Sequence, residues 1–393
     1  ELIRFLRAKL VDLMPAANES LVRLCPLCRN PTTTSVRRES LPVFQNVTYA
    51  TREEAVAASF GSFLLATCGH CGFSHNCEFE SDLVIYDDRY DNHVESGVFA
   101  TYYKDLVGLM TASFDLGGGV VYDIGCGDGE FLKILCEMSP DVFGIGIDPS
   151  CTPEVNDNYR LIQDTFEGCG IESGVRLLLL RHVLEHLDNP IGFLRTLRHT
   201  ISDVPLFVEV PDFEWILANG AFWDLSYEHC NYFTPQALRF ALEMAGFEVI
   251  RQDRSFGNQY QWAICVPGSS MSVPVGRGNM ATATVDSYAR VEDERLTRVR
   301  DMAENANGLA LWGMASKGVI LAVLLPEGAA IGGIDMNRAK QGRFAATTGL
   351  QIHPPEWLLG QAGITVAILN PNYAEEIRIL VQDLHADVKL AQR

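Results

Sequence analysis

The feature that most constrains the fold is a strand-like run followed by a glycine-rich turn and a helical run, in the segment VVYDIGCGDGEFLKILCEM. Gly125, Gly127 and Gly129 let the backbone turn sharply and approach a ligand where a Cβ atom would clash. Further apolar runs alternate with helical ones, among them VFGIGID, RLLLLRHVLEHL and PLFVEVPD. This alternation predicts a doubly wound α/β fold with a parallel sheet and crossover helices.

The spacing within this turn distinguishes between two kinds of cofactor. A dinucleotide fingerprint has its third glycine three residues after the second, and Glu130 occupies that position here. Asp128 and Glu130 would also repel a diphosphate at the start of the helix. A ligand with an ammonium and a sulfonium group tolerates these carboxylates, and the acidic Asp123 precedes the first glycine. The turn therefore predicts S-adenosylmethionine rather than a nicotinamide cofactor.

The ends of the next strands supply further candidate cofactor contacts. Asp148 closes the run FGIGID, where a carboxylate can accept hydrogen bonds from both ribose hydroxyls. Asp164 is expected near the adenine, and the segment VLEHLDNP is expected to line the methionine side, with His182 just before it as a further cofactor contact. His182, Glu185 and His186 do not predict a metal site, because no further ligand is in view. The alternative is a tight turn in an α/β protein that binds nothing there.

Two pairs of cysteines predict a metal site near the N-terminus. Cys25 and Cys28 form CPLC, and Cys68 and Cys71 form CGHC, so each pair can hold one ion through a tight turn. Four thiolates leave no open position for water, which indicates a structural zinc ion. The alternatives are free thiols or a redox pair. Three nearby residues could replace one of the four ligands: His70, His75 and Cys77.

The chain of 393 residues is too long for one ordinary core, and composition divides it into three predicted domains. Residues 1–85 are expected to form a zinc-binding domain and residues 86–266 a methyltransferase domain that binds S-adenosylmethionine. Residues 267–280 are rich in Pro, Gly and Ser and are typical of a linker. Residues 281–393 are expected to form a Rossmann-like α/β domain, and residues 1–15 an amphipathic helix.

Charge and composition restrict the partners. The net charge of −19 opposes binding to a phosphate backbone, so a small-molecule substrate is expected and nucleic acid is not. No apolar run approaches the roughly 20 residues that a membrane-spanning helix needs. The first residues are not typical of a signal peptide, and the eleven cysteines are an odd number in a long chain. We therefore expect a cytoplasmic protein with reduced thiols.

Several segments resemble a known family. DIGCGDGEF, GID and RHVLEHLDNP resemble the class I methyltransferases. The cysteine pairs, EVPDFEWILANGAFWDLSYEHCNYFT, LWGMASKGV and ILNPNYAEEI resemble the three-domain C-methyltransferases of deoxysugar and antibiotic biosynthesis, over nearly the whole chain. The resemblance implies an N-terminal zinc-binding domain and a middle domain that binds S-adenosylmethionine. It also implies a C-terminal Rossmann-like domain that helps to hold a thymidine diphosphate 4-keto sugar.

Methyl transfer to a carbon beside a carbonyl needs a base that forms an enolate. The best candidate is His229 in YEHCNYF, because histidine titrates near neutral pH and this segment follows the carboxyl end of the fifth strand. Glu228 could orient a neighbour or hold a sugar hydroxyl, and the resemblance also implies an adjacent Glu-His pair. Tyr227 and Tyr232 could donate hydrogen bonds to the enolate. The alternative is that these side chains only pack a loop onto the core.

Two other segments are expected near the ligands. Tyr86, Tyr90, Tyr102 and Tyr103 resemble the tyrosine-rich lid of the family, which implies that Tyr90 lies at the cofactor. The run YDDRYDNHVESGVFATYY itself departs from the pattern of the sugar enzymes. In WGMASKG, Lys317 could meet a phosphate, or the turn could simply pack within an inert domain.

The sequence thus predicts an S-adenosylmethionine-dependent methyltransferase that C-methylates a nucleotide-linked keto-deoxysugar, with His229 as the base and a purely structural zinc ion. The alternative enzyme is an N- or O-methyltransferase acting on another small natural-product intermediate. The alternative of another class is a non-catalytic binding module built on the cofactor fold.

Overall fold

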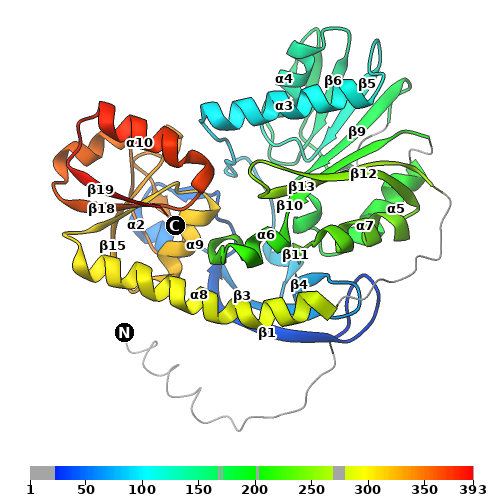
Figure 1. Ribbon diagram of the computed structural model, residues 1–393. Helices are drawn as coiled ribbons and strands as arrows, with labels where there is room; N and C mark the ends of the chain where they lie inside the picture. Colours follow the sequence, from blue (N-terminus) through cyan, green and yellow to red (C-terminus); the bar gives the residue numbers. More distant parts are fainter. Residues whose placement is uncertain (1–22, 167–168, 170, 201–202, 269–278, 393) are drawn as a thin grey trace.

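The computed structural model describes residues 23–166, 169, 171–200, 203–268 and 279–392 (Figure 1). The predicted N-terminal amphipathic helix and most of the predicted linker lie outside these residues. Within them, none of the helices has the length and apolar character needed to span a membrane.

The largest sheet has eight strands, is built from the middle of the chain and lies to the right of the C-terminal sheet in Figure 1. Its strands, in spatial order, are β12 (Phe247–Ser255), β13 (Tyr260–Pro267), β10 (Leu206–Pro211), β9 (Val175–Arg181), β5 (Val120–Ile124), β6 (Phe143–Ile147), β8 (Tyr159–Ile162) and β7 (Glu154–Val155). The five strands from β10 to β8 pair in parallel. A parallel sheet needs crossover connections, which explains the alternation of apolar and helical runs in the sequence.

Both faces of this sheet are covered by helices, so the fold is the predicted doubly wound α/β class. Strand β9 shows the pattern: Leu178 and Leu180 pack into one core, and Leu177 and Leu179 into another on the opposite face. The first face carries α5 (Pro190–Thr200) and α7 (Pro235–Met244), and the second carries α3 (Gly97–Ser113) and α4 (Glu130–Met138). A short helix, α6 (Phe213–Ala218), follows β10.

Both edges of the sheet differ from the purely parallel prediction, and at one of them β7 pairs antiparallel with β8. Strand β13 runs antiparallel between β10 and β12, and a hairpin connects β12 to β13. The hairpin turn contains Phe256, Gly257 and Asn258, all with positive φ (48°, 65° and 65°). Only a few residues separate the two strands, so no crossover helix can form and the antiparallel pairing follows.

The N-terminal sheet takes one strand from the middle of the chain. It comprises β1 (Thr32–Pro42), β3 (Phe60–Cys68), β4 (Ser74–Asn76) and β11 (Asn231–Tyr232), in this order. Asn231 on β11 pairs with His75 on β4, and the backbone N–H of Asn76 donates to the carbonyl oxygen of Cys230 at 2.8 Å. The N-terminal sheet is therefore joined to the segment that directly follows His229.

The C-terminal sheet is parallel and carries its own helices. Its strands, in spatial order, are β17 (Ile352–His353), β15 (Ala330–Ile334), β14 (Leu309–Trp312), β18 (Ile364–Ile368) and β19 (Val388–Gln392). Its helices are α9 (Ser316–Leu324) and α10 (Ala374–Asp383), and the long α8 (Asn279–Asn305) runs along β1 and β3 (Figure 1). Strand β16 (Phe344–Ala345) pairs with β2 (Thr48–Tyr49), and α2 (Arg52–Val56) follows β2. The N- and C-terminal parts therefore share one apolar core.

Candidate active site

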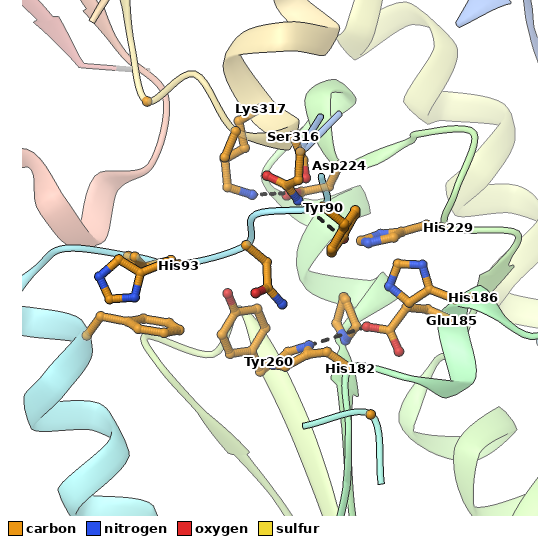
Figure 2. A pocket seen from close by; sticks show the side chains of 18 of the residues that line it. Tyr90, His93, His182, Glu185, His186, Asp224, His229, Tyr260, Ser316 and Lys317 are labelled. Atoms are coloured by element: carbon orange, nitrogen blue, oxygen red, sulfur yellow. Dashed lines mark hydrogen bonds and ion pairs between the residues drawn. The ribbon is translucent and has the colours of Figure 1, made fainter. Parts of the chain in front are cut away.

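A cavity of about 660 Å³ lies between the carboxyl edge of the eight-stranded sheet and the C-terminal sheet. Its walls come from three regions: the segment 86–96 that precedes α3, the loops at the carboxyl edge of the large sheet, and the loops that follow β14, β15 and β18. Figure 2 shows Glu185, His186 and His229 grouped on one side of this cavity and His93 on the opposite side. Side chains from the eight-stranded sheet and from the C-terminal sheet can therefore contact one ligand.

The glycine turn between β5 and α4 lies at the base of the cavity. Gly125, Gly127 and Gly129 have φ values of 74°, 57° and 78°, which side-chain-bearing residues rarely adopt. A Cβ atom on Gly125 would lie 2.3 Å from Cγ2 of Val183, and one on Gly129 would lie 2.7 Å from Cδ2 of Leu161. The backbone conformation and the packing therefore both require glycine, as the sequence predicted for a turn at a ligand.

Asp148 and Asp123 lie on either side of this turn. Oδ2 of Asp148 accepts from the backbone N–H of Gly127 at 2.9 Å, and Oδ1 accepts from the backbone N–H and hydroxyl of Ser150 at 2.7 and 2.6 Å. Asp148 also lines the cavity, so its remaining lone pairs can accept from a ligand. Asp123 is 1% exposed, and its Oδ1 atom has no partner among the described residues. An orphaned buried carboxylate oxygen fits a cationic ligand group.

We expect Asp148→Ala to raise the dissociation constant of S-adenosylmethionine about 10- to 100-fold, because it removes charge-assisted hydrogen bonds to the ribose and loosens the glycine turn. Isothermal titration calorimetry measures this change. Asp157→Ala is the matched control, because Asp157 is exposed on the same domain and faces away from the cavity lining. Equal affinity of Asp148→Ala and wild type would contradict a cofactor role for Asp148.

Donor affinity should depend on pH through Asp123. Burial raises the pKa of Asp123 to about 7, with Asp148 adding to the rise and Arg181 opposing it. Its carboxylate is therefore charged above this pH and becomes neutral below it, so affinity for the cationic donor should fall as the pH decreases from 7.5 to 6. Calorimetric titrations across this range test the dependence. The Asp123→Asn variant, which cannot titrate, should bind weakly with a flat profile; a wild-type profile in this variant would refute the assignment.

Three other predicted cofactor residues lie on the cavity wall, whereas Asp123, Gly127 and Gly129 are not among the lining residues. Asp164, His182 and Tyr90 all line it. His182 has a φ of 53°, its Nδ1 atom lies 3.3 Å from Oε1 of Glu185, and its ring packs edge-on against Tyr260. The hydroxyl of Tyr90 accepts from the side-chain amide of Asn46, at 3.3 Å, in the N-terminal part of the chain. Each of these positions lies within reach of a ligand in the cavity.

His229 lines the cavity, whereas Glu228 and Tyr227 are not among the lining residues. Desolvation, together with the charges of His186, His182 and Lys317, holds the pKa of His229 well below its usual range. A neutral imidazole at pH 7 can accept a proton, which is the state that a general base requires. Asn231 and Tyr232 on β11 pair with β4, and this pairing fixes the backbone that follows His229.

Glu228 is 1% exposed and is held by polar contacts rather than by a basic side chain. The backbone N–H of Gln45 donates to its Oε1 at 3.2 Å, and the hydroxyl of Tyr86 donates to its Oε2 at 3.5 Å. Burial raises the pKa of Glu228. The same Tyr86 hydroxyl lies 2.8 Å from Nδ1 of His186, so one tyrosine connects the two residues.

The structure does not bring Tyr227 or Tyr232 to the cavity. The hydroxyl of Tyr227 accepts from the backbone N–H of Glu80 at 2.9 Å, and its ring occupies the space where Gly61 lacks a side chain. The hydroxyl of Tyr232 accepts from the backbone N–H of Ser226 at 3.1 Å. Both rings are buried and fill the core between the N-terminal sheet and the middle of the chain. Their packing role corresponds to the alternative considered from the sequence.

Two lysines of the C-terminal part line the cavity, and the sequence singled out only one of them. Lys317 forms an ion pair with Asp224, so its charge is already compensated by the protein. Lys340 is 1% exposed, and its Nζ atom donates to Oδ1 of Asn46 at 3.2 Å, a neutral partner. A buried ammonium group with a neutral partner is suited to an anionic ligand. No sequence signal marks Lys340, because its burial arises only when the N- and C-terminal parts pack together.

The four predicted metal ligands come together. Cys25 Sγ lies 3.6 Å from Cys71 Sγ, and Cys28 Sγ lies 3.4 Å from Cys68 Sγ, with all four sulfur atoms within 4.8 Å of one another. The possible substitutes lie outside this cluster. His70 contacts Asn30, His75 stacks on Phe73, and Cys77 contacts Arg23. The separation of the sulfur atoms matches the edge of a tetrahedron around a zinc ion with Zn–S bonds of about 2.3 Å.

Comparison with known proteins identifies the class of the middle domain. Residues 99–252 match a family model described as a methyltransferase domain. This range includes the glycine turn, Asp148 and His229. The middle of the chain is therefore a methyltransferase domain. No curated protein matches the chain in sequence.

Solved structures of methyltransferases resemble part of the chain. RosA from Streptomyces davawensis, an N,N-8-amino-8-demethyl-D-riboflavin dimethyltransferase, is 20% identical, with a TM-score of 0.35, over 44% of this chain and 56% of its own. CalO1, a methyltransferase in calicheamicin biosynthesis, is 18% identical, with a TM-score of 0.34, over 43% and 54%. Human N-acetylserotonin methyltransferase is 17% identical, with a TM-score of 0.36, over 44% and 53%. The chain thus spans just over half the length of each of these three proteins.

Proposed function

We propose that this enzyme transfers a methyl group from S-adenosylmethionine to a carbon atom of a nucleotide-linked keto-deoxysugar, with His229 as the base. The observation that carries the proposal is that one cavity contains the glycine turn, a neutral His229 and the buried cation of Lys340. The glycine turn suits the methyl donor, His229 suits a weakly acidic C–H group, and Lys340 suits a diphosphate. The family resemblance of the sequence supports the same acceptor.

The cofactor end of the cavity fits S-adenosylmethionine. Asp148 offers carboxylate lone pairs for the ribose, and the orphaned Oδ1 of Asp123 suits the ammonium of the methionine part. The glycine turn permits a close approach of the backbone. When bound, the cofactor supplies an electrophilic methyl group on a positively charged sulfur. Aromatic side chains of the segment 86–103 exclude water from this end of the cavity.

At the acceptor end, His229 is proposed to remove the proton beside the keto group. The imidazole would accept this proton and the electron pair of the C–H bond would move into an enolate. The enolate carbon would then take the methyl group as the methyl–sulfur bond breaks and S-adenosylhomocysteine leaves. Tyr86 can turn its single O–H from Oε2 of Glu228 to the enolate oxygen and donate a hydrogen bond there. His186 contacts the ring of His229 edge-on, with centroids 4.8 Å apart, and fixes its plane.

Lys340 is proposed to bind the diphosphate of the acceptor. We expect Lys340→Met to raise the dissociation constant of thymidine diphosphate about 10- to 100-fold, because a charge-assisted hydrogen bond is lost. Calorimetric titration measures the change. S-adenosylmethionine affinity should be unchanged, and Lys389→Met, which alters an exposed lysine on β19, serves as the matched control. Unaltered nucleotide affinity in Lys340→Met would remove the main structural support for this acceptor.

The reaction itself is tested with methyl-¹³C S-adenosylmethionine and a thymidine diphosphate 4-keto sugar. The proposal predicts a product whose ¹³C resonance lies in the range of a methyl group on carbon. It also predicts that the enzyme exchanges the acidic proton of the acceptor with deuterated solvent. A resonance typical of a methyl group on oxygen or nitrogen, without proton exchange, would refute C-methylation and favour the alternative enzyme.

The four-cysteine cluster is proposed to hold a structural zinc ion. Its four soft ligands fill a tetrahedron and leave no position for substrate, and a reducing compartment such as the cytoplasm keeps the thiols free. Three of its cysteines pack into the same core as Leu184, which precedes Glu185, and Phe233, which follows β11. Zinc would thereby stabilise the position of His229 without touching the substrate.

A further inference from the structure

A second group of metal-ligand side chains lies at the acceptor end of the cavity. Glu185 and His186 belong to the 3₁₀ turn that follows β9, and His229 lies just before β11. Each residue offers one ligand atom, and these atoms lie within 4.8 Å of one another. All three residues line the cavity, and Figure 2 shows them facing the same space. The fold thus supplies the third ligand, His229, that sequence spacing alone did not reveal.

Glu185 carries a charge that the protein leaves incompletely compensated. It is 1% exposed, its Oε1 atom lies 3.3 Å from Nδ1 of His182, and its Oε2 atom has no partner among the described residues. Glu228, a second buried carboxylate nearby, is held by a backbone N–H and a tyrosine hydroxyl. Buried carboxylates are normally paired with cations or coordinate metals. The unpaired Oε2 atom of Glu185 is therefore suited to coordinate a cation.

His186 is already oriented as a ligand. Its Nδ1 atom lies 2.8 Å from the hydroxyl of Tyr86, which fixes the ring and leaves Nε2 for another contact. Metal-bound histidines characteristically have their second ring nitrogen held in this way. The rings of His186 and His229 meet edge-to-face at an interplanar angle of 87°, so they do not stack and can approach one ion from two directions.

We propose that Glu185, His186 and His229 bind one divalent first-row transition-metal ion, such as Zn²⁺ or Co²⁺. Two imidazoles and one carboxylate are a borderline ligand set that suits these ions better than Mg²⁺ or Ca²⁺. Three protein ligands leave coordination positions open toward the cavity, unlike the closed four-cysteine cluster. The chain therefore carries two metal sites of different chemistry.

Occupancy of this site has a consequence that rests on the proposed function. A neutral imidazole has a single basic nitrogen, so a metal ion and a proton compete for His229. When a metal ion occupies this site, His229 can no longer act as the base. Transition-metal ions in excess of the structural zinc should therefore inhibit methyl transfer. The inhibition should follow the occupancy of the second site and not that of the four-cysteine cluster.

Metal counting by native mass spectrometry tests the site without any acceptor. The wild-type protein, first loaded with one zinc ion per chain, should take up a second ion when Zn²⁺ or Co²⁺ is added. Glu185→Gln and His186→Gln should each lower uptake of this ion at least tenfold. His353→Gln, which alters a histidine outside the cluster, should bind as the wild type does. Retention of the first zinc ion shows that a variant is folded.

Cobalt spectra of the wild type provide a readout that does not depend on variants. The second Co²⁺ should add ligand-field absorption without the thiolate-to-cobalt charge-transfer band of a cysteine site. One ion per chain at metal excess, or a second ion with thiolate absorption, would overturn the site. If the second ion binds as predicted but methyl transfer is unaffected, the competition for His229 is overturned. A protein that binds the ion but transfers no methyl group even before the second ion is added refutes the proposed function, not the site.

Discussion

Replacing His229 with glutamine is expected to lower kcat for methyl transfer by about 10²- to 10⁴-fold, the usual contribution of a positioned general base. Glutamine retains the approximate shape and polarity of histidine but cannot take up the proton of the acceptor. Proton exchange of the acceptor with deuterated solvent should fall in parallel, because the same group forms the enolate. Product formation and exchange are both measured by nuclear magnetic resonance.

Two controls separate catalysis from folding. The dissociation constant of S-adenosylmethionine should be nearly unchanged in His229→Gln, since the glycine turn and Asp148 lie at the other end of the cavity. His199→Gln, which alters an exposed histidine on α5, should react like the wild type. If His229→Gln retained more than about a tenth of the wild-type rate, a base role for His229 would be untenable.

Replacing Cys71 with serine is expected to destabilise the protein by on the order of 5 kcal/mol, because loss of a structural metal site is among the largest effects of a single substitution. Cys71 is buried, and its Sγ atom lies within the four-cysteine cluster. Activity should fall with stability, since β4 of the same sheet pairs with β11 beside His229. Denaturant unfolding and zinc content by mass spectrometry measure the two effects.

Cys77 provides the matched control for this prediction. It lies on the same module, but its thiol contacts Arg23 and the carbonyl oxygen of Leu64 and lies outside the cluster. Cys77→Ser should therefore retain one zinc ion and cost about 1 kcal/mol or less. If Cys71→Ser were as stable as Cys77→Ser, the four cysteines would have no structural metal role.

The eight-stranded sheet and the cysteine cluster could be predicted from the sequence because the patterns that indicate them involve residues close together in the chain. The glycine turn, the alternation of apolar and helical runs and the two cysteine pairs each depend on residues that are close together in the chain. They predicted the doubly wound class and the grouping of the four cysteines, which the structure bears out. The β12–β13 hairpin was missed because its antiparallel pairing depends on the short turn at Phe256–Asn258 rather than on a difference in composition.

Long-range packing accounts for what the sequence could not predict. Lys340 becomes buried only where the C-terminal part meets Asn46 of the N-terminal part. His229 joins Glu185 and His186 because Asn231, two residues further on, donates to the carbonyl oxygens of Leu184 and Leu187, which flank them. The residues around Tyr227 in the sequence do not indicate that its hydroxyl contacts the backbone of Glu80 rather than a substrate. Such contacts between distant segments are set by tertiary packing and leave no periodic pattern.

The most direct test of the central conclusion is native mass spectrometry of the chain with S-adenosylmethionine. The account predicts one donor molecule per chain in the wild type, strongly reduced in Asp148→Ala and unaffected in Asp157→Ala. Absence of donor binding to a folded, zinc-containing wild-type chain would contradict the assignment of the cavity as a methyl-donor site.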